Sequence, residues 1–296
     1  MNDDQIIDIF CNVDDFMLTM HDKSASNLLS SNKCQRHRET KLSNSEIMTI
    51  MILFHRSGYR TFKHFYLRHV QCHWRHYFPY LLSYTRFVAL LPRIIAPLCA
   101  FLRSRLGTCT GISFVDSTKV AVCHPKRIRA NRVFKNIAKI GRTTTGWFFG
   151  FKLHLVVNDN GELLSMHFTP GNVDDRSPLD MMTGGVFGKI FGDKGYISQD
   201  LSQLLMQRGL QLVTNVKKNM KNKLMPLIDK ILLRKRSIIE TINDQLKNIS
   251  QIEHSRHRST ANFAINLLAG LVAYTFQPKK PRINMAYDVG NMLLAA

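Results

Sequence analysis

The chain has 296 residues, of which 45% are hydrophobic, so it can bury a substantial core and is long enough for two domains. This composition excludes a disordered chain. Lys and Arg number 41 against 21 Asp and Glu, and the resulting formal charge of +20 favours a polyanionic partner such as DNA, RNA or an acidic membrane.

The charge is distributed unevenly along the sequence. Residues 1–22 contain six acids and no Lys or Arg, whereas residues 117–158 contain nine cations and no acid. The acid-free segment 117–158 is either a solvated basic surface or one wall of a groove for a polyanion. Its cations are Lys119, Lys126, Arg127, Arg129, Arg132, Lys135, Lys139, Arg142 and Lys152.

Features absent from the sequence argue against a zinc-binding protein and against a membrane protein. The six cysteines show no paired short spacing of the kind that zinc sites need, which fits reduced thiols in a cytosol. No charged-then-apolar signal opens the sequence. The longest apolar stretches, residues 263–276 and 87–102, are too short or too interrupted by charge and proline to span a bilayer. A membrane is therefore not expected as a partner.

The first third of the sequence predicts helices. Ser43 and Glu46 form a capping box ahead of an apolar helical pattern, and a second short helix follows the Ser57–Gly58 turn. Two helices joined by such a turn resemble a helix-turn-helix, but any small helical domain has this pattern, so DNA reading by residues 43–70 is one of two interpretations. Residues 84–105 predict a longer helix with kinks at Pro92 and Pro97.

From Gly107 onward the pattern changes to strands alternating with helices. The predicted mixed sheet has helices packed on it. Its strands span residues 111–119, 147–157, 162–169, 186–192 and 210–216, with a hairpin turn at Asn158–Gly161. The predicted helices span residues 198–208, 226–252 and 260–276.

Three acids stand out by their places in these elements. Asp116 interrupts an apolar strand, and Asp193 follows the strand that ends at Gly192, where sheet proteins gather ligands. Glu240 lies in the predicted helix at 226–252. That helix has a stripe predicted to be buried, formed by Ile239, Ile242, Leu246 and Ile249.

A polar edge runs along the same helix beside the apolar stripe. Its members are spaced i, i+4, i+7 and i+11: Arg236, Glu240, Asn243 and Lys247. A helix packed on the sheet can aim this edge at the two aspartates. Taken singly, each acid also has a structural explanation, as a strand-end cap or as a surface pair between Arg236 and Glu240.

Three carboxylates in one place suit a defined chemistry. Magnesium prefers hard oxygen ligands and keeps several waters, so two or three Asp or Glu with phosphate oxygens complete its shell. Two such ions can activate a water or a 3′-hydroxyl and stabilise the leaving oxygen in a displacement at phosphorus. No side-chain nucleophile is needed.

The chain resembles the DDE transposases of bacterial insertion sequences. There the first Asp ends a strand in a Val-Asp-Ser type motif, as at residues 115–117, and the second lies in Gly-Asp-Lys-Gly-Tyr, as at residues 192–196. The third acid often belongs to a Tyr, Arg, Glu, Lys signature with two, three and six residues between successive members. Here Arg236, Glu240 and Lys247 match, and Leu233 stands in place of the Tyr.

The resemblance extends over residues 111–276 and includes the Pro170–Asp175 segment. It is nearest to the insertion-sequence family numbered nine-eighty-two, which resembles this chain through its helical N-terminal part as well. It implies an α/β fold with an RNase H-like mixed sheet flanked by helices, preceded by an all-helical domain. The implied division is a DNA-binding or dimerisation domain at 1–106, a catalytic domain at 107–277 and a basic tail at 278–296.

The resemblance also implies the site and its partners. Asp116, Asp193 and Glu240 would be catalytic and hold two Mg²⁺ or Mn²⁺ ions. Double-stranded DNA would be the partner, as the terminal inverted repeats of an element and as target, bound by a homo-oligomer in the bacterial cytoplasm at the nucleoid. The residues expected to contact DNA are Arg236, Lys247, Lys194, Arg127, Arg129, Arg132 and Lys135.

Several alternatives remain open from the sequence. The protein can be an RNase H-like nuclease that cuts without joining, or a non-catalytic, domesticated DNA-binding protein that uses residues 43–70. Asp174 and Asp175 are expected to order a loop rather than bind metal. His154 is either near Asp116 or simply packed. The basic segment at 125–142 suits a flexible arm that becomes ordered on the DNA backbone.

Overall fold

The computed structural model describes residues 2–28, 41–144, 146–216, 224–253 and 257–283. The chain forms two compact units. The first contains residues 1–105 and 246–276, and the second contains residues 106–245 and 277–296. The three-part division into domains that the sequence suggested stays a prediction.

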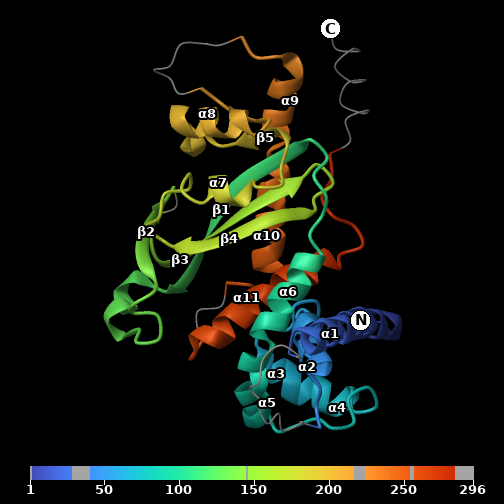
Figure 1. Cartoon of the computed structure of the whole chain (residues 1–296). Coiled ribbons are helices and arrows are strands. Elements are labelled where there is room, and N and C mark those ends of the chain that lie inside the picture. Colours follow the sequence, from blue (N-terminus) through green and yellow to red (C-terminus); the bar gives the residue numbers. More distant parts are fainter. Residues whose placement is uncertain (1, 29–40, 145, 217–223, 254–256, 284–296) are drawn as a thin grey trace. The chain divides into compact units, whose positions relative to one another are not determined.

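The first unit is helical in the part that the structure describes (Figure 1). Its elements are α1 (Asp3–Leu28), α2 (Asn44–Phe54), α3 (Phe62–Phe65), the π-helical turn η1 (Tyr66–Val70), α4 (Gln71–His73), α5 (Tyr84–Leu90), the 3-10 turn η2 (Leu91–Ile94), α6 (Ile95–Ser104) and α11 (Thr260–Thr275). The capping box is confirmed, because the Ser43 side chain accepts from the backbone N–H of Glu46 and the Glu46 carboxylate accepts from that of Ser43. α2 is buried on all sides from Ile47 to Phe54, so it is the core helix of this unit.

The segment Tyr84–Ser104 has one break rather than two. The α-helix tightens into the 3-10 turn η2 at Pro92. Pro97 lies in the first turn of α6, where backbone N–H groups have no partner within the helix, so the expected kink there is absent. By length and composition this segment is apolar enough to cross a membrane. Its buried side chains, among them Phe87, Ile94 and Leu98, account for that apolarity as core packing.

A mixed six-stranded sheet forms the centre of the second unit. Its strands are β1 (Ile112–Cys123), β2 (Lys139–Thr143), β3 (Gly146–Asn158), β4 (Leu163–Pro170), β5 (Gly188–Gly192) and β6 (Leu210–Thr214). β1 and β3 pair antiparallel, and β2 and β4 pair with successive parts of the other edge of β3. β5 and β6 continue the sheet parallel to β1. This order and these directions confirm the RNase H-like α/β class.

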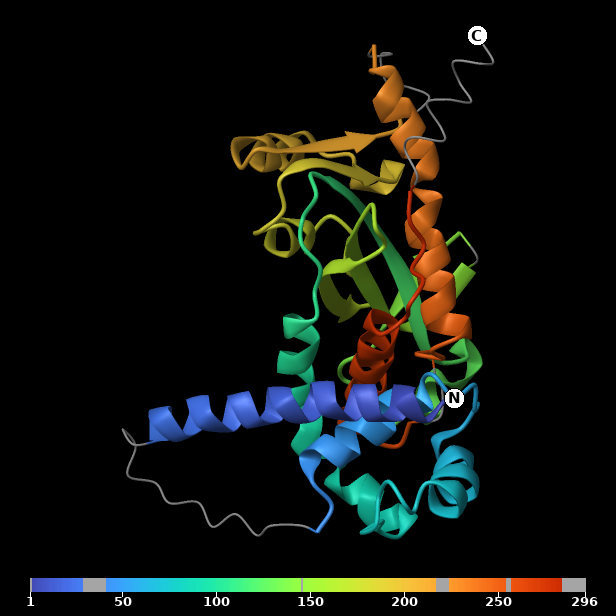
Figure 2. The same cartoon turned by 90° about the vertical axis from the view of Figure 1, so that its right-hand side faces the viewer.

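Helices cover both faces of this sheet (Figure 2). They are the 3-10 turn η3 (Pro125–Ala130), α7 (Leu179–Met182), the 3-10 turn η4 (Lys194–Tyr196), α8 (Gln199–Gln207), α9 (Leu227–Lys235) and α10 (Ser237–Asn248). α7 and α8 lie on one side, and α9 and α10 run along the other. The hairpin predicted at Asn158–Gly161 joins β3 to β4 as expected. β2 was not predicted, because its five residues are mostly polar and include a glycine.

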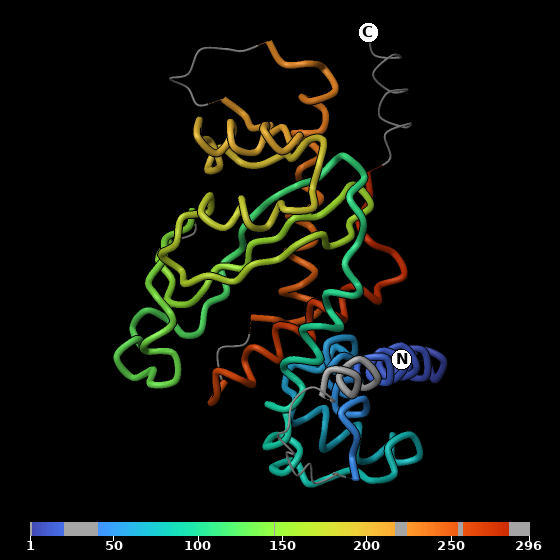
Figure 3. The backbone as a smooth tube through the Cα atoms, viewed as in Figure 1, coloured from blue at the N-terminus to red at the C-terminus, as the bar shows by residue number. Residues whose placement is uncertain are grey.

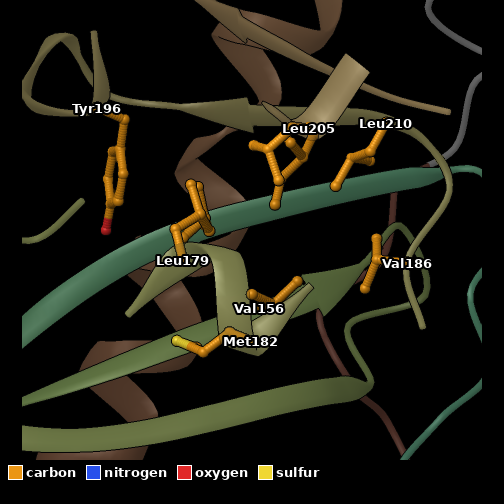
Figure 4. Packing of buried hydrophobic residues seen from close by; sticks show 9 residues of the cluster. Val156, Leu179, Met182, Val186, Tyr196, Leu205 and Leu210 are labelled. Carbon is orange, nitrogen blue, oxygen red and sulfur yellow. The ribbon is translucent and has the colours of Figure 1, made fainter. Parts of the chain in front are cut away.

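Side-chain alternation along β1 assigns each residue to a face. Val115 lies in the hydrophobic cluster with Leu179 of α7 and Leu205 of α8 (Figure 4). Its neighbours Phe114 and Asp116 therefore point to the opposite face, where α9 and α10 lie. Phe114 stacks on Phe191 of β5 there, with ring centroids 5.6 Å apart.

The single helix predicted over residues 226–252 is two helices. α9 ends at Lys235 and α10 begins at Ser237, with Arg236 at the junction. The apolar stripe of α10 is confirmed at Ile239, Ile242 and Leu246. The prediction of burial is wrong at Ile249, which is 54% exposed because α10 ends at Asn248.

Candidate active site

Strand register brings Asp116 and Asp193 to the same face of the sheet. Phe114 of β1 pairs with Phe191 of β5 in parallel register. Each aspartate lies two residues beyond its phenylalanine, so both extend from the same side of adjacent strands. The charge of Asp193 acts on Asp116 and raises its pKa. Asp116 lies within β1 and Asp193 directly after β5, which agrees with the strand positions predicted for them from the sequence.

Gly192 explains part of the Gly-Asp-Lys-Gly-Tyr sequence at this junction. A Cβ atom at this position would lie 3.1 Å from both the ring of Tyr196 and a methyl group of Val115. Tyr196 is buried, and burial together with the charges of Asp116 and Asp175 raises the pKa of its hydroxyl well above the ordinary value. The ring thus packs against the strand that precedes Asp193 and fixes the turn that carries it.

Asp116 is held in a mostly buried setting. Its side chain is 22% exposed, and burial raises the pKa of its carboxyl to about 6. Arg236 and the backbone N–H of Ser117 oppose this rise, while the charges of Glu240 and Asp193 add to it. Three acids therefore repel one another in this place, which is an unfavourable arrangement that a bound cation relieves.

Arg236 connects two of these acids in the structure. Its Nη2 atom lies 2.6 Å from Oε1 of Glu240, and its Nη1 atom lies 3.7 Å from Oδ1 of Asp116. The Arg236 side chain is only 18% exposed. At Arg236 the polar edge thus lies toward Asp116, one of the two aspartates at which it was expected to be aimed.

Asn243 is a residue of this site that the sequence did not single out. Its Nδ2 atom donates to Oδ2 of Asp116 at 3.0 Å, and the residue is 7% exposed. Its Oδ1 atom is buried, with no hydrogen-bond partner among the described residues. The signal was its place on the polar edge, one turn beyond Glu240 on the side of α10 that turned out to face Asp116.

The carboxylates suit a divalent metal by chemistry, because Mg²⁺ prefers hard oxygen ligands. Within the described part of the chain, no group of three or more His, Cys, Asp and Glu side chains converges on a point that could hold a metal ion. Asp193 accepts the backbone N–H of Lys194 at 2.6 Å, and Glu240 is 56% exposed and paired with Arg236. The three acids share one face without closing around a single point.

The other residues predicted to bind DNA have diverse settings. Lys194 is exposed next to Asp193 in η4. Lys247 lies 3.8 Å from the carboxylate of Glu253 in the first unit. The side chains of the basic segment are exposed at Arg127, Arg129, Arg132 and Lys135.

The basic segment itself is folded, which corrects the expectation of a flexible arm. It follows β1 at the end away from β5 (Figure 3). Phe134 is 2% exposed and its ring meets that of Phe151 of β3 edge-on, with centroids 5.9 Å apart. The cations are therefore presented on a surface that is already ordered.

His154 and the two loop acids lie apart from Asp116. In the β1–β3 pairing, Asp116 faces Leu155 while His154 faces Ser117, so the histidine points to the opposite side of the sheet. His154 is buried, and its Nε2 atom hydrogen-bonds Thr169 at 2.8 Å. Burial lowers its pKa to about 4. It is a packed residue.

Asp174 and Asp175 order the loop after β4, as expected. Asp175 accepts a 2.9 Å hydrogen bond from Nζ of Lys152. Asp174 pairs with Arg176 at 2.6 Å, and this pairing lowers the pKa of Asp174 to about 2. Both carboxylates are thus used in holding the loop.

Of the comparisons with known proteins, the one with family models gives an extensive match. The family model described as "transposase DDE domain" matches residues 106–260, which is more than half of the chain. A search of curated proteins finds no match. Among solved structures, the chain is similar to the cryo-electron-microscopy structure of the simian T-cell lymphotropic virus intasome in complex with PP2A regulatory subunit B56 gamma. The identity is 13%, over 64% of this chain and 67% of that chain, with a TM-score of 0.26, too low to support an argument.

Proposed function

Because this chain belongs to the transposase DDE domain family, we propose that it cuts and joins DNA by metal-dependent phosphoryl transfer at Asp116, Asp193 and Glu240. The observation that carries the proposal is the meeting of three elements at one place. β1 and β5 supply two aspartates on one face, and Asn243 of α10 binds the first of them directly. The same helix supplies Glu240 one turn away.

In this proposal the three carboxylates hold Mg²⁺ or Mn²⁺, with two ions at the working site. When bound, the ions would supply activation of the attacking oxygen and stabilisation of the leaving one. Asn243 orients the carboxylate of Asp116 through the 3.0 Å hydrogen bond. Arg236 lies against Asp116 and Glu240, and a metal held by these carboxylates would leave its guanidinium available to bind phosphate.

The finer biology belongs to the same proposal. The protein would bind the terminal inverted repeats of its own element, expose a 3′-hydroxyl and join that end to target DNA. Lys194 would contact phosphates near Asp193, and Lys247 and the basic segment would each contact phosphates as well. Joining needs both ends held together, so we expect a homo-oligomer on DNA in the bacterial cytoplasm.

A cleavage and strand-transfer assay on the DNA ends of the element tests this function. Wild type is compared with Glu240→Gln and Asp193→Asn in Mg²⁺ or Mn²⁺, and Asp200→Asn, an exposed acid at the start of α8, is the matched control. We expect metal-dependent nicking and joining that both site variants reduce by on the order of a thousandfold. The control should act like wild type. Equal activity of wild type and site variants would refute the proposal.

The same assay separates the alternatives. Cutting without joining would indicate a nuclease of the same fold. Binding of the ends without cutting by any variant would indicate a non-catalytic DNA-binding protein. Leu233, which occupies the signature's Tyr position, is 7% exposed in α9 and serves packing, so the role of that aromatic must be absent or carried elsewhere.

A further inference from the structure

The hairpin formed by β2 and β3 carries a tryptophan that the fold does not use. Trp147 is 63% exposed, whereas the other tryptophan of the chain, Trp74, is 6% exposed. A large aromatic side chain normally contributes to stability through burial. An indole left in water at the tip of a hairpin therefore indicates a contact made with another molecule.

The residues around Trp147 indicate that this other molecule is negatively charged. Arg142 pairs with Trp147 across the hairpin, and its guanidinium carbon lies 5.5 Å from the centre of the indole ring. The chain from 117 to 158 has no acid. Exposed cations surround the hairpin in sequence: Lys126, Arg127, Arg129, Arg132, Lys135, Lys139 and Arg142. This surface fits a polyanion and repels another basic surface, including that of a second copy of this chain.

The position of Trp147 along the strand relates it to the acids. Alternation along β3 puts Trp147 on the same face as Leu155, the residue that pairs with Asp116. Eight residues of strand span roughly 26 Å, since each residue advances about 3.3 Å. This equals the length of seven to eight stacked base pairs at about 3.4 Å each. A DNA strand cut at the acids can thus reach the hairpin without bending back.

We propose that Trp147 is a base-stacking site, at which the indole stacks on an unpaired or unstacked base of a DNA strand held by the neighbouring cations. The proposal rests on the proposed function and adds to it a contact with a base. Cations alone are enough to bind phosphates, and they do not require an aromatic partner. Aromatic rings serve where bases leave the duplex, because every base has a flat face to stack on.

The geometry also indicates which form of DNA is bound. In a duplex the faces of the bases are covered by their neighbours, so an indole reaches one only at an end, a nick or an extruded nucleotide. Arg142 lies over the indole ring, and the tryptophan is still 63% exposed, so it can meet a base from solvent. Single-stranded DNA and duplexes with unpaired ends should therefore bind at Trp147, and closed duplexes should not.

Tryptophan fluorescence and DNA anisotropy together test the proposal. The protein is titrated with a single-stranded oligonucleotide, a duplex of the same length with an unpaired 3′ end, and a closed dumbbell duplex. Wild type is compared with Trp147→Leu and Trp147→Phe, and Trp74→Phe shows which tryptophan reports. We expect quenching with the first two DNAs that persists in Trp74→Phe. Trp147→Leu should weaken their binding about tenfold, Trp147→Phe should restore most of it, and the dumbbell should change less than twofold.

The outcomes separate this inference from the proposed function. If wild type binds DNA by anisotropy, but its fluorescence is unchanged and Trp147→Leu binds single strands equally well, stacking is refuted while the transposase proposal stands. An equal loss of affinity for all three DNAs would also refute it, since that is the pattern of a general surface contact. If wild type binds none of the DNAs, both proposals fail. Because Trp147 is exposed, its variants should unfold at the wild-type temperature.

Discussion

Strands β1 and β3 carry two candidate functional regions of opposite character. At the β5 side, Asp116 is mostly buried and depends on Arg236 and Asn243, with each contact defined by a distance between two atoms. At the other end, the basic segment presents cations to solvent, and its core contact is the side chain of Phe134. The first region consists of a few side chains in fixed positions. The second is a basic surface to which many side chains contribute.

This difference predicts how each region responds to change. A metal site requires carboxylates in fixed places, so one substitution removes its function. Phosphate contacts are distributed over many cations, so each contributes a share and the sum depends on salt. Replacing a single cation should therefore have a small effect, and the comparison is tested best by removing several at once.

The largest expected effect on DNA binding comes from neutralising the basic segment. A variant with Arg127, Arg129, Arg132 and Lys135 changed to Gln should bind duplex DNA on the order of a hundredfold more weakly at low salt. The plot of log affinity against log salt should become shallower by about 3 to 4, because each lost phosphate contact removes about 0.9. Anisotropy titrations over a range of salt concentrations measure both quantities.

A matched variant distinguishes a local contact from an effect of net charge. It changes four exposed cations of the first unit that lie outside residues 43–70, Arg75, Arg86, Arg93 and Arg103, to Gln. We expect a smaller change in slope for nonspecific duplex. Equal changes in the two variants would mean that only the total charge matters, and the basic segment would lose its special role.

The sequence predicted which residues belong to the two regions better than it predicted the structural environment of those residues. Alternation and turn signals located β1, β3 and β4. Asp116 stood out as a carboxylate within an apolar strand, and Asp193 stood out by its place after a strand end. Whether the basic segment is folded did not follow from the sequence, because a segment with many cations and no acid can equally be a disordered arm. Burial of Phe134 depends on a contact with Phe151, which is distant in sequence and has no local signal.

Removing the anchor of the basic segment should have the next largest effect. Phe134→Ala leaves a hole beside Phe151 and should cost about 3 kcal/mol of local stability. Trypsin should then cut native protein faster within residues 126–142, whereas Phe134→Leu, which keeps most of the volume, should be cut slowly. Mass spectrometry of the first fragments measures this. Equal cutting of wild type and Phe134→Ala would show that the segment is an open arm after all.

At the acid end, ionisation of Asp116 should destabilise the metal-free protein. Burial raises its pKa from 3.8 to about 6, so above pH 6 the folded state carries a charge that the unfolded state carries at lower cost. Asp116→Asn should therefore stabilise the protein by about 3 kcal/mol at pH 8, because each unit of the pKa rise is worth about 1.4 kcal/mol. The gain should shrink as the pH falls from about 6 toward 4, below which the wild-type carboxyl becomes protonated in both states.

Thermal unfolding at pH 8 and pH 4 in the presence of a metal chelator measures this difference. Asp200→Asn is the control, since that carboxylate is exposed at the start of α8 and its replacement should change the unfolding temperature little at either pH. A destabilised Asp116→Asn variant at pH 8 would mean that the pair with Arg236 outweighs burial, and the site would then be a structural ion pair.

The contacts of α10 could not be predicted, although the polar edge that makes them was visible. Spacing along a helix shows which side chains share a side, but not how far the helix is rotated on the sheet. That rotation decided that Asn243, rather than Glu240, is the residue in direct contact with the Asp116 carboxylate. The break at Arg236 also had no signal, because Lys235, Arg236 and Ser237 are all compatible with a continuous helix.

The smallest expected effect concerns Asn243. Asn243→Ala removes the hydrogen bond to the Asp116 carboxylate, which is worth about 1 kcal/mol, so metal-dependent cleavage should fall about fivefold at low Mg²⁺. Loss of a donor disfavours the charged carboxylate, so the pKa of Asp116 in the metal-free protein should rise further above 6. Carbon-13 NMR of the side-chain carboxyl measures that pKa directly. Thr241→Ala, an exposed change on the same helix, should alter neither quantity. A loss of cleavage with an unchanged pKa would show that Asn243 only packs α10, and the acid end would then depend on fewer exact contacts than the comparison requires.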